Sequence, residues 1–151
     1  MIPALFSRAG IALKEQSLSP GIAETTAKRL QRNIVKYELP GGWKALVGKS
    51  DEDNDFLSLK MARPNDFWFH VRGMPGSHVV LRAKSNENPG REILKHAAAV
   101  AAFHSKARRG GVVSVSCTRA RYVTKPKGAK PGSVHIRKES VLKVRPRLPE
   151  G

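Results

Sequence analysis

Two histidines, a tryptophan and an arginine surround a Pro-Gly turn near the middle of the chain. Trp68, His70 and Arg72 precede the turn, and His78 follows it. Two imidazoles near one another can serve as a general acid and a general base. An aromatic ring beside cationic groups can instead stack on a nucleic-acid base. The segment therefore indicates either RNA-processing chemistry by His70 and His78 or recognition of RNA.

The residues around this turn alternate in the manner of two β-strands. Apolar Phe67, Phe69 and Val71 occupy the odd positions, and Val79 and Leu81 continue the pattern after the turn. If residues 73–77 connect an antiparallel pair, the odd-numbered side chains pack inward and the even-numbered ones share the other face. The residues expected to face a ligand are Trp68, His70, Arg72, Ser77, His78 and Arg82.

Each of these groups also has a structural interpretation. Tryptophan is usually highly buried, so Trp68 could belong to an ordinary core. Histidines at a strand end commonly bond to backbone groups or to a neighbouring carboxylate, for which Asp66 is the nearest candidate. The pattern alone leaves both interpretations open.

The charge of the chain favours a polyanionic partner. The sequence has 28 Lys and Arg against 12 Asp and Glu, a formal net charge of +16. Between residues 104 and 149 there are 13 basic residues and one acid, Glu139. Such a field attracts nucleic acid. An anionic membrane surface or a basic enzyme are the alternatives, and no apolar run reaches the length of a membrane span.

Residues 124–132 form a lysine-rich loop with two prolines that stiffen it and two glycines that let backbone amides approach a ligand. It lacks the spacing of a P-loop. We expect phosphate contacts here, with a solvated basic turn as the alternative. The alternation of the preceding strand fails near residue 118, since Arg119 and Arg121 would point inward, so a bulge or strand end is expected there. The predicted phosphate-binding residues are Lys125, Lys127 and Lys130, and Arg119 and Arg121 are further expected nucleic-acid contacts.

The pattern of the whole chain predicts a single α+β domain, with a mixed or mostly antiparallel sheet packed by a long alanine-rich helix. Residues 1–33 are expected to form an arm with a short basic helix at 22–33, residues 34–146 the domain, and residues 147–151 a tail. The long helix is expected to start at Asn88 and Pro89 and to end near residue 108. The acidic cluster at 51–55 indicates a helix start or, as an alternative, a calcium or magnesium site. Strands are expected at 35–39, 43–47, 67–71, 79–82, 112–118, 133–137 and 141–144.

Other chemistries have little support in the sequence. The single cysteine, Cys117, suggests a buried apolar residue in a reducing compartment, so we expect a cytoplasmic protein. No Cys/His group has zinc spacing, and neither a nucleotide-binding fingerprint nor a nucleophile elbow occurs. We therefore expect no metal, no cofactor and no catalytic residue beyond the histidine alternative.

These residues together resemble the NFACT RNA-binding domain, NFACT-R, of ribosome-associated quality-control proteins once catalogued as fibronectin-binding proteins. The resemblance runs from about Tyr37 to Pro146. Its blocks, which follow Gly48, are NDFLSLK at 54–60, DFWFH at 66–70, PGSHVVLR at 75–82, AAAVAAFHSKAR at 97–108 and VTKPKGAKPG at 123–132.

The resemblance implies an RNA-binding module, expected here as a stand-alone domain. Its expected ligand is transfer RNA or ribosomal RNA, with the large ribosomal subunit as a further partner. The alanine tailing performed by full-length relatives is not expected of this chain. Two other hypotheses remain, an RNA-processing or RNA-modifying enzyme that uses His70 and His78, and a ribosome-associated adaptor.

Overall fold

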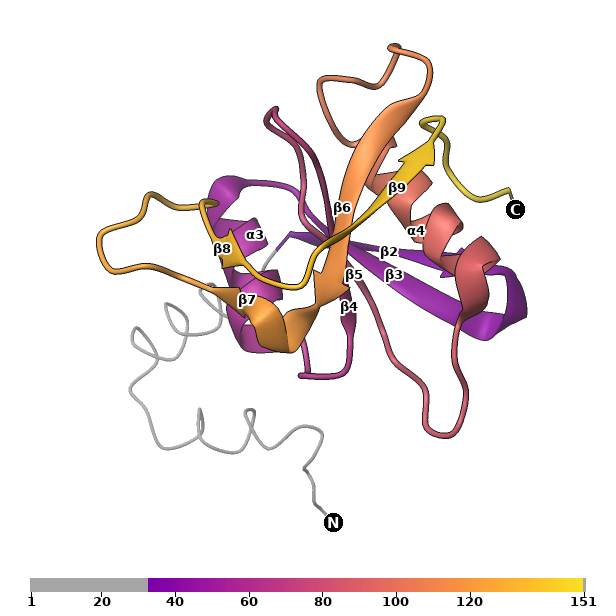
Figure 1. Cartoon of the computed structure of the whole chain (residues 1–151), viewed down its shortest axis with the longest axis horizontal. Coiled ribbons are helices and arrows are strands. Elements are labelled where there is room, and N and C mark those ends of the chain that lie inside the picture. Colours follow the sequence, from indigo (N-terminus) through magenta and orange to yellow (C-terminus); the bar gives the residue numbers. More distant parts are fainter. Residues whose placement is uncertain (1–32, 151) are drawn as a thin grey trace, which may run out of the picture. The chain divides into compact units, whose positions relative to one another are not determined.

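The computed structural model describes residues 33–150, in which a six-stranded sheet carries a long helix on one face. The strand order is β2-β3-β5-β4-β6-β9, and every neighbouring pair is antiparallel (Figure 1). This confirms the predicted α+β class. The strands are β2 (Ile34–Leu39), β3 (Trp43–Gly48), β4 (Phe67–Val71), β5 (Val79–Leu81), β6 (Val113–Arg119) and β9 (Ser140–Val144).

The two predicted hairpins are present. Strands β2 and β3 are joined through η1 (Pro40–Gly42), where Gly41 and Gly42 have φ angles of 80° and 79°, the left-handed region that glycine tolerates. Strands β4 and β5 pair with Trp68 opposite Val80. Even-numbered residues of both strands therefore share one face, as predicted.

Helix α4 (Gly90–Phe103) covers the odd face of the sheet (Figure 1). Residues 97–102 are all buried, and their alanines let the helix approach the strands closely. The helix begins at Gly90 without a side-chain cap, so the Asn88 cap is not formed. It ends at Phe103, five residues before the predicted end, because Ser105 forms a β-bridge with Gly76.

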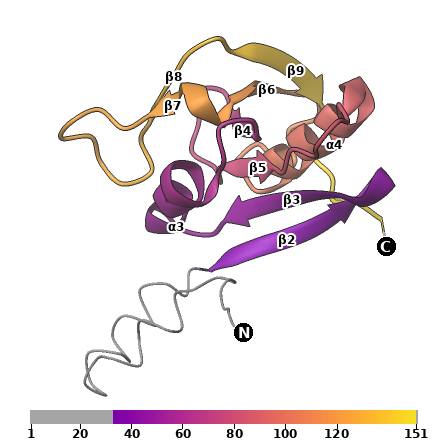
Figure 2. The ribbon, with the colours of Figure 1, turned by 90° about the horizontal axis from the view of Figure 1, so that it is seen from below.

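Helix α3 (Asp51–Phe56), continued by η2 (Leu57–Met61), covers the even face. Ser50 caps it by accepting a hydrogen bond from the Asp53 amide at 3.0 Å, which confirms the predicted helix start at the acidic cluster. A second core lies between the sheet and the segment formed by α3 and η2, and it contains Leu46, Leu57, Trp68, Val80 and Val123. Figures 1 and 2 show α3 and α4 on opposite sides of the sheet.

The chain after β6 forms a small second sheet. After η3 (Ala120–Tyr122), strand β7 (Val123–Thr124) pairs with β8 (His135–Ile136), and the lysine-rich loop between them projects from the domain (Figure 2). The two predicted closing strands therefore join different sheets, because β9 pairs with β6. The arm and helix predicted within residues 1–32 lie outside the described residues.

Candidate nucleic-acid interface

The predicted face of aromatic and histidine side chains exists, but it is a core. The rings of Trp68, His70 and His78 lie with centroids 5.1–6.0 Å apart. Trp68 is 3% exposed and donates from Nε1 to Ser58 Oγ at 2.8 Å. The prediction that Trp68 forms an exposed stacking platform is therefore wrong, since the segment of α3 and η2 packs over this face.

His78 is the centre of a buried hydrogen-bonded network. Its Nδ1 lies 2.7 Å from Ser58 Oγ and its Nε2 lies 3.0 Å from the carbonyl oxygen of Gly132. Because a carbonyl can only accept, Nε2 carries the proton, and Nδ1 accepts from the Ser58 hydroxyl. Both ring nitrogens are thus occupied inside the protein. The acid-base role suggested for His78 does not fit this geometry, and the arrangement suits positioning of the loop that contains Gly132.

Burial keeps His78 neutral. Desolvation, reinforced by the neighbouring His70, lowers the pKa of His78 to about 4. Burial also lowers the pKa of His70. The side chain of His78 is 2% exposed, so protonation would place an uncompensated charge in the second core.

The first prediction concerns pH. The unfolded chain protonates His78 near pH 6.5, whereas the folded protein does so near pH 4, so the unfolded state binds more protons between these values. The free energy of unfolding should therefore fall as the pH drops from 6.5 to 4, by about 2–3 kcal/mol from this group. Urea titrations across this range should show a smaller pH dependence for His78→Gln, although that variant is less stable at neutral pH. An equal dependence in both proteins would contradict the assignment.

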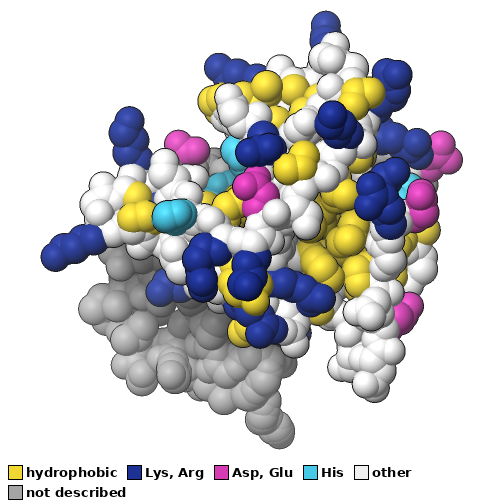
Figure 3. All heavy atoms as spheres, viewed as in Figure 1, with side chains coloured by type: hydrophobic (Ala, Val, Ile, Leu, Met, Phe, Trp, Pro, Cys, Tyr) yellow, Lys and Arg dark blue, Asp and Glu magenta, His cyan; other side chains and the backbone are white. Residues whose placement is uncertain are grey.

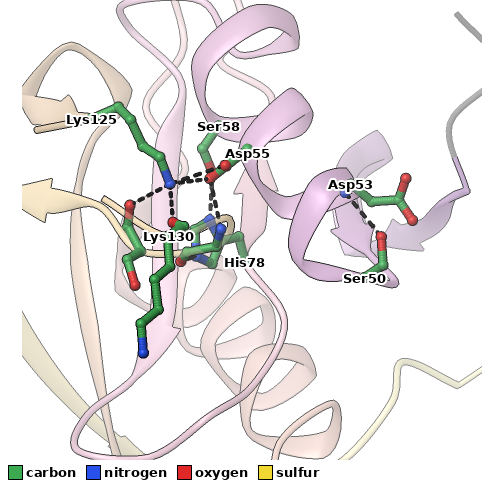
Figure 4. Close-up of polar contacts among 9 residues, drawn as sticks. Ser50, Asp53, Asp55, Ser58, His78, Lys125 and Lys130 are labelled. Atoms are coloured by element: carbon green, nitrogen blue, oxygen red, sulfur yellow. Dashed lines mark hydrogen bonds and ion pairs between the residues drawn. The ribbon is translucent and has the colours of Figure 1, made fainter. Parts of the chain in front are cut away.

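Lys125 fastens the lysine-rich loop to helix α3 (Figure 4). Its ammonium lies 3.0 Å from an Asp55 carboxylate oxygen and donates to the carbonyl oxygens of Ser133, at 2.8 Å, and Lys130. The same carboxylate accepts from the Gly132 amide at 3.0 Å. Lys125 is therefore occupied within the protein, in contrast to its expected role at phosphate. We call Asp55, Ser58, His78, Lys125 and Gly132 the loop anchor.

The two other lysines of the loop are free. Lys127 and Lys130 are exposed, and their ammonium groups have no partner among residues 33–150. Figure 4 shows the Lys130 side chain pointing away from the loop anchor. These two cations remain available to an external anion.

The two arginines expected on the aromatic face, Arg72 and Arg82, have partners inside the domain. Arg82 donates to Asp66 Oδ2 at 2.9 Å and to the carbonyl oxygen of Met61 at 3.0 Å. Asp66 is 1% exposed, so Arg82 neutralises a buried carboxylate and does not face bases as expected. Arg72 is more exposed and pairs with Glu139 at 3.2 Å.

Ser77 lies in a basic hollow that the sequence did not predict. The Ser77 amide donates to the carbonyl oxygen of His104 at 2.9 Å, which joins the turn at 75–77 to the end of α4. The hollow has a volume of about 390 Å³, and its lining includes the exposed cations Lys49, Lys106 and Arg108. Burial lowers the pKa of His104 to about 4, and the positive charges of Lys49 and Arg108 add to this effect because they disfavour a protonated imidazole.

The hollow and the loop adjoin. Asn54, which lines the hollow, accepts from the His78 amide at 3.0 Å. Asp51 also lines it, and a Cβ on Gly132 would lie 2.8 Å from an Asp51 carboxylate oxygen. One surface therefore collects exposed cations of both segments, of which Arg108 lies 3.8 Å from the centroid of the Phe103 ring. We call it the basic surface, and its members are Lys49, Lys106, Arg108, Lys127 and Lys130.

Arg119 and Arg121 lie elsewhere. The β4–β6 register pairs Phe67 with Arg119 at one end and Val71 with Val115 at the end that leads into the 72–78 turn. Arg119 donates to the carbonyl oxygen of Asn65 at 2.8 Å, and Arg121 contacts the Asn65 side chain. The structure therefore does not bring these arginines to the basic surface.

The second prediction concerns Gly48, where a methyl group has no room. A Cβ there would lie 2.3 Å from Asn54 Oδ1 and 2.9 Å from the Asn54 amide nitrogen. Gly48→Ala should displace the side chain that holds the His78 amide and destabilise the domain by about 1–3 kcal/mol. Gly73→Ala, at a glycine with no atom near its missing Cβ, controls for loss of glycine, although its φ of 77° adds some strain. An unfolding temperature of Gly48→Ala close to that of the wild-type protein would contradict this account of the contact.

Comparison with known proteins adds to this geometry. Residues 37–138 match the family described as "NFACT protein RNA binding domain". The chain is 44% identical over 141 residues to the Rqc2 homolog RqcH of Streptococcus suis and 39% identical over 113 residues to that of Bacillus subtilis. These alignments cover 89% and 75% of the chain but 25% and 19% of those proteins.

A solved structure has a similar fold. The C-terminal part of the fibronectin/fibrinogen-binding protein of Streptococcus suis matches with a TM-score of 0.72 and 32% sequence identity. The alignment covers 87% of this chain and 59% of that one. The chain thus corresponds to between a fifth and a quarter of the curated relatives' length and to more than half of the solved fragment.

Proposed function

The chain belongs to the NFACT RNA-binding domain family, and we propose that it binds RNA through the basic surface as a module of ribosome quality control. The observation that carries the proposal is the loop anchor, whose hydrogen bonds and ion pair tie a lysine-rich loop to the domain beside the hollow at Ser77. A held loop presents its cations without a large ordering cost on binding. The similarity to RqcH proteins supports the proposed role in ribosome quality control.

The basic surface suits phosphate contacts more than readout of bases. Its five members are exposed Lys and Arg, whose ammonium and guanidinium groups bind phosphate oxygens. Its neighbouring aromatic ring, Trp68, is buried and offers no face to a base. We infer that recognition here depends on the shape and backbone of a folded RNA. Transfer RNA and ribosomal RNA are the proposed ligands, and the cytoplasm the proposed location.

The third prediction tests this function through its salt dependence. About five phosphate contacts imply a slope between about −3.5 and −4.5 for the logarithm of the association constant against the logarithm of the salt concentration, from roughly −0.7 per contact on single strands to −0.9 on duplexes. Fluorescence anisotropy with labelled transfer RNA should give this slope. A slope near zero, or no binding at low salt, would contradict the proposed function.

Association with the large ribosomal subunit is the proposed cellular consequence. Sucrose gradients at low salt should show the protein migrating with large subunits, and at high salt the association should be lost. Migration that persists at high salt would favour the adaptor hypothesis, in which a protein contact holds the domain on the ribosome.

A further inference from the structure

A second groove lies at the other end of β6, away from the basic surface. It has a volume of about 440 Å³, within the range of ligand pockets. Figure 3 shows hydrophobic side chains exposed between β6 and α4, with Lys and Arg on both sides. Its floor is apolar and includes Leu94, Cys117 and Leu142. The lining contains no carboxylate.

Two aromatic rings with cations against them form the walls. The Arg119 guanidinium lies 4.0 Å from the centroid of the half-buried Phe67 ring. The Tyr122 ring has Arg137 at 5.4 Å and Lys138 at 5.8 Å. Guanidinium planes and aromatic rings are the groups on which splayed RNA bases stack.

The rim of the groove offers free positive charge. Arg91 and Lys138 are exposed and line it, and the side chain of neither forms a hydrogen bond or ion pair with another of residues 33–150. Together with Arg119, three cations surround an apolar floor. An apolar peptide has no anionic group to pair with these cations, whereas a nucleotide has both an apolar ring face and an anionic phosphate.

We propose that this groove binds one unpaired nucleotide, its base stacked on the Arg119 guanidinium, which lies on the Phe67 ring, and beside Tyr122, and its phosphate at Arg91 and Lys138. The proposal rests on the proposed function, because the nucleotide belongs to an RNA held by the basic surface. It adds selectivity, since only an RNA with a base out of its helix can fill both sites. It also gives Arg119, which lies apart from the basic surface, a ligand to contact.

The test uses two RNA hairpins that differ by a single bulged 2-aminopurine. The wild-type protein should bind the bulged hairpin about 5- to 150-fold more tightly, the range of one stacked base. The 2-aminopurine fluorescence should change on binding. Tyr122→Ala should abolish both the preference and the fluorescence change while leaving the salt slope with the unbulged hairpin intact.

A variant at the rim of the groove tests the proposal independently of whether Tyr122→Ala folds. Arg91→Glu replaces an exposed side chain and should likewise remove the preference. Lys95→Ala, one turn along the same helix and outside the groove, should retain it.

The outcomes separate the two proposals. If the wild-type protein binds neither hairpin, the proposed function fails and the groove proposal with it. If it binds both hairpins equally, the groove proposal alone is overturned. If groove variants keep the preference but lose migration with ribosomal subunits, the groove binds a protein and the nucleotide assignment is overturned.

Discussion

Replacing Lys127 and Lys130 together by glutamate is expected to reduce the affinity for transfer RNA by about tenfold or more at moderate salt. Two cations that face the ligand are lost, and two anions take their place beside phosphates. The salt slope should become shallower by about 1.4 to 1.8, twice the contribution of one phosphate contact. Both side chains are exposed and unpaired, so the thermal stability should stay near that of wild type.

A matched variant separates local contact from overall charge. Lys36→Glu with Lys143→Glu makes the same change in net charge on two exposed lysines of β2 and β9. This variant should keep most of the affinity, since neither residue lies on the basic surface. Equal losses in the two double variants would mean that net charge alone drives binding.

Asp55→Ala is expected to weaken RNA binding several-fold, although it removes a negative charge near the ligand. The Asp55 carboxylate accepts from the Gly132 amide and pairs with Lys125, so its loss removes two of the contacts that hold the loop on α3 and leaves the His78–Gly132 hydrogen bond. Lys127 and Lys130 would then have to be ordered by the RNA, at a cost in affinity. Unpaired polar groups should also lower the free energy of unfolding by about 1–3 kcal/mol. Anisotropy titrations and urea unfolding measure the two effects.

Glu52→Ala is the control for this result. Glu52 is an exposed acid in the same helix and makes no contact with the loop among the described residues. Its removal should leave affinity unchanged or raise it slightly, as charge alone predicts. If Asp55→Ala binds RNA as tightly as Glu52→Ala, the loop anchor has no part in binding.

The sequence predicted which residues share a face but not what covers that face. Alternation within 67–71 and 79–81 established the hairpin and its register, because a strand places successive side chains on opposite sides. The same pattern could not show that the segment 51–61 packs over Trp68. Covering a sheet face is a contact between distant segments, and each segment's own periodicity is compatible with either an open or a covered face.

The same limitation explains the misassigned lysine. Lys125, Lys127 and Lys130 look equivalent in a basic loop. The structure distinguishes them because Asp55, 70 residues earlier in the chain, lies beside Lys125 and not beside the others. Cations near one another in sequence can thus divide between internal pairing and ligand binding.

The sequence did not predict the cations of the hollow because the expected end of the helix was too late in the chain. The expected helix end near residue 108 would place Lys106 and Arg108 in the last turn, where cations are favourable at the negative end of the helix dipole. The helix in fact ends at Phe103, and the Gly76–Ser105 bridge turns these side chains toward the 75–77 turn.

The location of bound RNA tests the central claim most directly. Transfer RNA that contains 4-thiouridine can be photo-crosslinked to the wild-type protein, and the modified peptides can be identified by mass spectrometry. We expect crosslinks in the loop at 125–133 and in the segments at 75–78 and 104–109 that frame the hollow. Crosslinks confined to β2 and β9, with none in these segments, would contradict the account.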